Sequence, residues 1–179
     1  MRVAFQGVRG AFSELAAKDF FGTRAALVPL REFDEVFAAV MRKQVHFGIV
    51  PVENSLAGSI HQNYDLLRNS NVWICGEYKL RVQHNLLALP GVRRADLRKV
   101  ISHPQALAQC AKYIRKLKGV TSEPFFDTAG SARHVAATRD RNVAAIANAA
   151  AAKVYGLRVL AAGIEDNPHN FTRFLILAP

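Results

Sequence analysis

The sequence predicts an α/β fold made of two α/β lobes, and three observations support this prediction. Strand-like apolar segments alternate with helix-like amphipathic segments along the chain, an order typical of largely parallel sheets with helices on their faces. The pattern starts again after Pro90-Gly91. Long extended segments precede and follow the middle block, so we expect the chain to cross between lobes there. We therefore place residues 1–78 plus 160–179 in a first, discontinuous lobe and residues 79–159 in a second lobe.

The first lobe begins with a strand, a glycine turn and a helix. Its second helix has the clearest pattern, because the apolar residues from Phe33 to Met41 recur at the spacing of one helix face. The expected elements are strands at 3–5, 25–30, 47–52 and 72–75, helices at 11–21, 33–41 and 59–67, and an extended segment at 78–89.

The middle block repeats this alternation. Its first helix, with apolar residues from Leu107 to Leu117 on one face, is expected to end at Gly119, because glycine is common at helix C-termini. The other expected elements are strands at 100–101, 120–126 and 143–146, a helix starting at Asp127-Thr128, an alanine-rich helix ending at Gly156, and an extended segment at 159–177 that residues 165–169 interrupt.

Charge and composition limit the class of protein. The formal net charge is +10, but the basic residues are scattered and form no basic tail, so a solvated basic surface is expected rather than nucleic-acid binding. Neither a membrane helix nor a signal peptide is predicted, which favours a cytoplasmic protein. The two cysteines, Cys75 and Cys110, have neither disulfide-framework nor zinc-site spacing, so no metal is expected.

Polar residues follow several of the predicted strands. In α/β sheets ligands bind beyond these strand ends, where helix N-termini favour anions. Glu53-Asn54-Ser55 indicates ligand contact or support, with helix capping as the alternative. Ser13 either caps a helix or donates to an anion, and the Gly7 and Gly10 turn before it lacks the third glycine of the dinucleotide fingerprint.

Two histidines are candidates for a functional role. His84 lies in an apolar extended stretch, where a core histidine and a functional one are both compatible with the sequence. His103 starts a helix, where the dipole disfavours its charged form, so a packing or positioning role is expected.

The polar segment Asn170 to Arg173 is unusual because it enters an otherwise apolar C-terminal strand. Strand alternation sends Thr172 to one face of the sheet and Arg173 to the other. An arginine in such a strand needs a partner, and its guanidinium suits a carboxylate, although an edge or surface arginine is the alternative. The segment indicates a site for a small anion.

Taken in order, several motifs give the chain a resemblance to prephenate dehydratase over nearly its whole length. This resemblance implies two lobes like those of type 2 periplasmic binding proteins, with the active site in the cleft between them. It covers the catalytic domain and not the regulatory ACT domain that usually follows it. The motifs are residues 7–13, 51–59, 102–107, 127–129, 147–157 and 170–174.

The resemblance also implies the reaction and its residues. The enzyme converts prephenate to phenylpyruvate, water and carbon dioxide in phenylalanine biosynthesis, and aromatisation drives it without metal or cofactor. Thr172 is expected to assist the departing hydroxyl, and Glu53 to support it if burial keeps its carboxyl protonated. The expected substrate-binding residues are Ser13, Asn54, Ser55, Gln105, Thr128, Ala129, Asn170, Phe171 and Arg173.

Two other functions remain open at this point. Arogenate, which carries an amino group in place of the keto oxygen, is an alternative substrate for the same chemistry. A non-catalytic protein that binds small anions is an alternative of another class. As partners we expect a small dianionic substrate and a second copy of the chain in a homodimer or homotetramer, with no nucleic acid and no membrane.

Overall fold

The computed structural model describes residues 1–179, and the chain divides into two compact units. Unit 1 contains residues 1–8, 12–82 and 169–179, and unit 2 contains residues 9–11 and 83–168. The chain therefore enters unit 2 at Gln83 and leaves it after Pro168, a few residues later than the expected boundaries at 78 and 160. The difference arises because the last strand before unit 2 continues to Arg81, and because the strand at 158–162 pairs inside unit 2.

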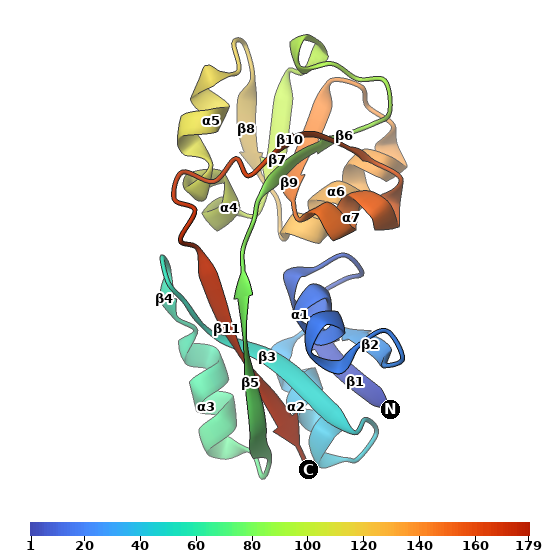
Figure 1. Cartoon of the computed structure of the whole chain (residues 1–179), viewed down its shortest axis with the longest axis vertical. Coiled ribbons are helices and arrows are strands. Elements are labelled where there is room, and N and C mark those ends of the chain that lie inside the picture. The colour runs from blue at the N-terminus through green and yellow to red at the C-terminus, as the bar shows by residue number, and fades with distance from the viewer. The chain divides into compact units, whose positions relative to one another are not determined.

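Unit 1 is built on a six-stranded mixed sheet in which five strands follow the order β2-β1-β3-β11-β5 and β4 pairs with β3 (Figure 1). β1 is parallel to β2 and β3, whereas β11 is antiparallel to both β3 and β5. The sheet is thus less parallel than expected, because the returning C-terminal strand inserts between β3 and β5. The strands are β1 (Arg2–Gln6), β2 (Ala26–Leu30), β3 (Phe47–Asn54), β4 (Gly58–Ser59), β5 (Trp73–Arg81) and β11 (Phe171–Ala178).

Helices cover both faces of this sheet. The helices are α1 (Phe12–Phe21), α2 (Phe33–Met41) and α3 (His61–Asn69). Leu175 and Leu177 of β11 pack in one core cluster with the apolar faces of α2 and α3. Ile176 points to the opposite face, where the ring of Phe20 from α1 also approaches Gly76. The alternation of β11 therefore supplies side chains to both layers of helices.

Unit 2 contains a five-stranded mixed sheet in the order β10-β6-β9-β7-β8. β7 is parallel to β8 and β9, and β6 is antiparallel to β9 and β10. Two core clusters, one with Leu86, Val100 and Ile146 and one with Leu87, Ile101 and Ala145, cover its two faces. The strands are β6 (Asn85–Ala88), β7 (Lys99–Ser102), β8 (Thr121–Pro124), β9 (Val143–Ala147) and β10 (Arg158–Ala162).

The helices of unit 2 are α4 (Pro104–Gln109), α5 (Ala111–Lys116), α6 (Thr128–Thr138) and α7 (Ala149–Tyr155), with a short 3-10 helix η1 (Arg94–Asp96). The single helix expected from Leu107 to Gly119 is two helices, because Cys110 leaves the helical conformation between α4 and α5. α5 ends at Lys116, so Gly119 lies beyond it in a turn of positive φ. None of these helices has the length and hydrophobicity that a membrane span requires.

Candidate active site

A hydrogen-bond network at the junction of β3 and β11 brings together the polar residues of two distant motifs. The side-chain amide of Asn54 donates to Asn170 Oδ1 at 2.8 Å, to Thr172 Oγ1 at 3.0 Å and to the Phe171 carbonyl at 3.2 Å. Asn54 is 8% exposed and Asn170 is fully buried, whereas Thr172 is partly accessible. A partly accessible threonine is therefore held by the buried amide of Asn54. We call Asn54, Ser55 and Asn170 to Thr172 the Asn54 network.

The orientation of the Asn54 amide follows from its other partners. Asn54 Oδ1 accepts from the backbone N–H groups of Leu56 and Ala57, at 3.1 and 3.0 Å. The opposite end of the amide must then be the NH₂ group, which can only donate. Thr172 Oγ1 is therefore an acceptor toward Asn54, and its own proton is left to be donated elsewhere.

Ser55 fixes the entry to β11. Its hydroxyl donates to the His169 carbonyl at 3.0 Å and accepts from the Phe171 N–H at 2.9 Å. Phe171 joins the network through its backbone carbonyl and N–H, and its ring lies 4.8 Å from the ammonium of Lys79. Ser55 and Phe171 thus position β11. For Ser55 this is the supporting role, one of the two roles that the sequence indicated.

Glu53 does not join this network. Thr172 pairs with Asn54 and Arg173 with Glu53, but Phe174 pairs with Pro51, so Val52 is an extra residue on β3. Such a bulge changes which face the following side chains take. Glu53 consequently lies on the face of Arg173, and it is exposed. The expectation that burial keeps the Glu53 carboxyl protonated beside the departing hydroxyl does not agree with this position.

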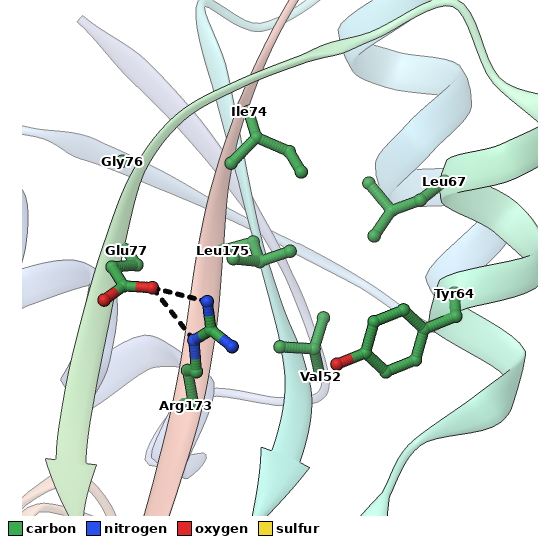
Figure 2. A pocket seen from close by; sticks show the side chains of 8 residues that line it. All are labelled: Val52, Tyr64, Leu67, Ile74, Gly76, Glu77, Arg173 and Leu175. Carbon is green, nitrogen blue, oxygen red and sulfur yellow. Dashed lines mark hydrogen bonds and ion pairs between the residues drawn. The ribbon is translucent and has the colours of Figure 1, made fainter.

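Arg173 points away from Thr172 and toward β5. Its Nε and one Nη lie 2.9 and 2.7 Å from Glu77 Oε2, and this contact raises the pKa of the guanidinium (Figure 2). The predicted carboxylate partner is thus Glu77 of the protein itself. In this arrangement the guanidinium is not available at Thr172, so the structure gives no support to its expected grip on the substrate there.

Ser13 lies at the second position of α1 and is 8% exposed. Its hydroxyl makes no side-chain hydrogen bond within the Asn54 network. Glu14 beside it is buried and forms an ion pair with Lys18 at 2.8 Å. Ser13 therefore stays a predicted contact at a helix N-terminus.

In unit 2 the predicted residues fall at two helix N-termini. His103 caps α4, with its Nδ1 accepting the N–H of Gln105 at 3.2 Å, which is the positioning role expected for it. Asp127 caps α6 by accepting the N–H of Gly130, and Thr128 and Ala129 form the first turn of this helix. Burial raises the pKa of the Asp127 carboxyl, while the bond from Gly130 opposes that shift.

His84 is a buried residue of unit 2. It is 2% exposed, and its Nε2 lies 2.9 Å from Gln109 Oε1. Burial lowers its pKa, although the hydrogen bond to Gln109 and the charge of Glu165 act in the opposite direction. Of the two interpretations left open by the sequence, the contacts favour the core histidine.

Asn148 supports the turn at Gly10, a role that its sequence pattern did not indicate. Its Oδ1 caps α7 by accepting the Ala151 N–H at 2.9 Å, and its Nδ2 donates to the Gly10 carbonyl at 2.7 Å. Tyr155 adds a bond from its hydroxyl to the Arg9 carbonyl at 2.6 Å. The available signal was an asparagine between an apolar strand and a helix, which is typical of a cap and does not predict the second contact.

Two α/β units, each built on a mixed sheet, define the fold class of the chain. Lipoprotein Tp32 from Treponema pallidum aligns over 99% of the chain with a TM-score of 0.52 at 12% sequence identity, a likeness that concerns the fold alone. The sequence itself identifies the family. A model of the prephenate dehydratase family matches residues 3–179, so the chain belongs to this family.

Similar proteins include plant enzymes. Arogenate dehydratase/prephenate dehydratase 2, chloroplastic, from Arabidopsis thaliana is 52% identical over 99% of the chain and 46% of its own length. Arogenate dehydratase 3, chloroplastic, from the same plant is 50% identical over 99% of the chain and 42% of its own length. The chain thus spans less than half the length of either relative. Their chloroplastic names contradict the expectation of a cytoplasmic protein.

Solved structures agree with this family. Prephenate dehydratase from Arthrobacter aurescens, in complex with L-Phe, has a TM-score of 0.92 at 27% identity and aligns with 99% of the chain and 60% of its own. A protein described as GqqA, a novel type of quorum quenching acylase, has a TM-score of 0.91 at 36% identity, over 99% of the chain and 64% of its own.

Proposed function

We propose that this protein is a carbon–oxygen lyase that converts prephenate to phenylpyruvate. The observation that carries this proposal, together with membership of the family, is the bond from the Asn54 amide to Thr172 Oγ1. Because that bond occupies an acceptor site of the hydroxyl, the Thr172 proton is directed away from Asn54. A hydroxyl group leaving the substrate ring is a suitable acceptor for it.

The reaction needs a proton at one end of the ring and an electron pair from the other. The C–O bond of the ring hydroxyl breaks with its electron pair on the oxygen, which leaves as hydroxide and becomes water by taking a proton from solvent. The C–C bond to the ring carboxylate breaks at the same time, and its electron pair enters the ring as carbon dioxide departs. Threonine is a weak acid, so Thr172 stabilises the departing oxygen as a hydrogen-bond donor. Its contact strengthens as negative charge grows on that oxygen, which is the condition for lowering the barrier.

Several residues contribute through the Asn54 network or through the family resemblance. Asn54 holds the threonine, Asn170 holds the Asn54 amide, and Ser55 and the Phe171 backbone fix the strand. We retain Ser13 of unit 1 and Gln105, Thr128 and Ala129 of unit 2 as proposed substrate contacts. Their places at helix N-termini suit a carboxylate.

A second candidate substrate is arogenate, which the same chemistry would convert to phenylalanine. The observation that favours it is the name of relatives that are about half identical to the chain. The reacting end of the molecule is unchanged, so the proposed role of Thr172 is the same for both substrates.

The test is a parallel assay of the chain with each substrate at neutral pH. Phenylpyruvate is followed by its absorbance in base, and phenylalanine by amino-acid analysis. Product from prephenate above the spontaneous rate is expected. Because one solved relative is described as an acylase, an N-acyl compound serves as a control and should not be hydrolysed. Binding of prephenate without product would favour the non-catalytic alternative.

The proposed partners are the substrate and further copies of the chain. Following the family resemblance, we propose a homodimer or homotetramer. Light scattering coupled to size-exclusion chromatography distinguishes these masses from that of the 19.7 kDa monomer.

A further inference from the structure

A pocket lies in unit 1, on the face of the sheet that carries Arg173. It has a volume of about 500 Å³, within the range of small-molecule sites, and is formed between α3 and the strands β3, β11 and β5 (Figure 2). Thr172 does not line it, and the alternation of β11 places the Thr172 side chain on the other face. The pocket is therefore separate from the Asn54 network. Its lining residues are Val52, Tyr64, Leu67, Ile74, Gly76, Glu77, Arg173 and Leu175.

One end of this pocket is apolar. Val52 and Leu175 form part of the core cluster beneath α3, and Leu67 packs against that cluster from the helix. Ile74 and Tyr64 are 55% and 41% exposed, whereas the apolar side chains of the core are buried. A ligand with an apolar group would remove this surface from water, and that burial would favour its binding.

The other end holds a charge pair with unused bonding capacity. Both contacts of Arg173 go to the single oxygen Glu77 Oε2, so Oε1 and one Nη remain for other partners. Figure 2 shows that this remaining Nη points to the side of the pocket where Val52 and Tyr64 lie. The two side chains are 48% and 62% exposed, and an ion pair at such a position contributes little to stability.

The charge balance of the pair restricts the ligand. A simple anion would approach a guanidinium whose charge Glu77 already balances, and it would be repelled by that carboxylate. A simple cation would approach a carboxylate whose charge Arg173 already balances, and the guanidinium would repel it. A molecule with adjacent positive and negative groups matches both members of the pair at once.

We propose that this pocket binds an α-amino acid with an apolar side chain. The carboxylate of the ligand accepts from Arg173, its ammonium donates to Glu77, and its side chain lies on Leu67, Ile74 and Leu175. This site is an addition to the proposed catalytic function and does not depend on it.

Binding is tested on the unmodified chain without any dehydratase substrate, by calorimetry and by the methyl resonances of Val52, Leu67, Ile74 and Leu175. The probes are L-leucine and L-phenylalanine. The analogues are 3-phenylpropanoate, which lacks the ammonium, and phenethylamine, which lacks the carboxylate. We expect both amino acids to bind and to shift these methyl resonances. Each analogue should bind about 10-fold more weakly, as the loss of one charged hydrogen bond predicts.

Two variants and a matched control complete the test. Glu77→Gln should weaken amino-acid binding about 10-fold or more, and Ile74→Trp should fill the apolar end and abolish binding. The control is Glu123→Gln, which removes a comparable exposed ion pair to Lys99 (2.6 Å) in unit 2 and should leave binding unchanged.

Three results would overturn the proposal: no binding of either amino acid at millimolar concentration, equal affinity for phenylalanine and 3-phenylpropanoate, or unchanged binding in the folded Glu77→Gln protein. Failure of the proposed function has a different signature. It is the absence of product in the prephenate assay, whatever the methyl resonances show.

Discussion

The side-chain amide of Asn54 donates a hydrogen bond to Thr172 Oγ1 at 3.0 Å, although the two residues are 118 positions apart in the chain. They lie directly opposite each other on β3 and β11, so their side chains share one face of the sheet. The same amide also bonds Asn170, which is fully buried. The hydroxyl of Thr172 therefore belongs to a rigid strand pair rather than to a loop.

A first prediction concerns Asn54→Asp. The substitution keeps the oxygen that caps the loop at Leu56 and Ala57, but it replaces the donor to Thr172 by an acceptor. The threonine proton would then turn toward the new carboxylate, and kcat should fall by at least about 10-fold at pH 7 with a smaller change in KM. Burial raises the pKa of such a carboxyl, so activity should partly return as the pH is lowered.

The comparison for this variant is Asn63→Asp, because the Asn63 amide also donates to a buried acceptor, the Pro51 carbonyl at 2.7 Å, but lies outside the network. Both variants should lose stability, and only Asn54→Asp should show the pH-dependent recovery of kcat. Equal pH profiles would mean that Asn54 acts only through the stability of the fold.

A second prediction concerns the turn at Gly10. This glycine has a φ of +84°, and a Cβ atom added there would lie 2.9 Å from Ala151 Cα. Gly22 has a φ of +77° but open space around it, so it provides a matched control. Gly10→Ala should reduce the free energy of unfolding by about 1 to 3 kcal/mol more than Gly22→Ala, as overpacking predicts. Urea denaturation measures both, and equal losses would contradict the close approach to α7.

A third prediction concerns pH and His84. Burial lowers the pKa of His84 in the folded chain, so the folded state binds a proton less readily than the unfolded state. In the unfolded state the histidine pKa is about 6.5. The stability contribution of the neutral ring is therefore present above this pH and is lost as the pH falls below it. Urea midpoints between pH 8 and pH 5 should show a smaller decrease for His84→Gln than for the unmodified chain. A decrease that is the same in the unmodified chain and in His84→Gln would show that other groups control the pH dependence.

Local patterns predicted most elements but not how they pair. Periodicity located most strands and helices of both units, but it missed β4 and η1 and divided β5 into two segments. The alternation of Thr172 and Arg173 gave their opposite faces correctly. The antiparallel insertion of β11 between β3 and β5 could not be predicted, because strand pairing depends on contacts between segments about a hundred residues apart. The break between α4 and α5 at Cys110 was not predicted either, because the apolar positions continue across it at the spacing of one helix face.

The site shows the same division between local and distant information. Asn54, Asn170 and Thr172 were identified from their motifs, and the structure brings them together. The extra residue Val52 on β3 sends Glu53 to the other face, and a bulge of this kind leaves no local signal in an apolar strand. The partner of Arg173 is Glu77, 96 residues away, which the strand pattern did not indicate.

The central claim is that the hydroxyl of Thr172 assists the departing oxygen of prephenate, and the most direct measurement is kcat for Thr172→Ser and Thr172→Val. Serine keeps the hydroxyl and valine keeps the shape without it. We predict that the serine variant retains kcat within about 10-fold, and that the valine variant loses about 100-fold or more with KM little changed. A Thr172→Val enzyme that folds and turns over prephenate at the rate of the unmodified chain would contradict the claim.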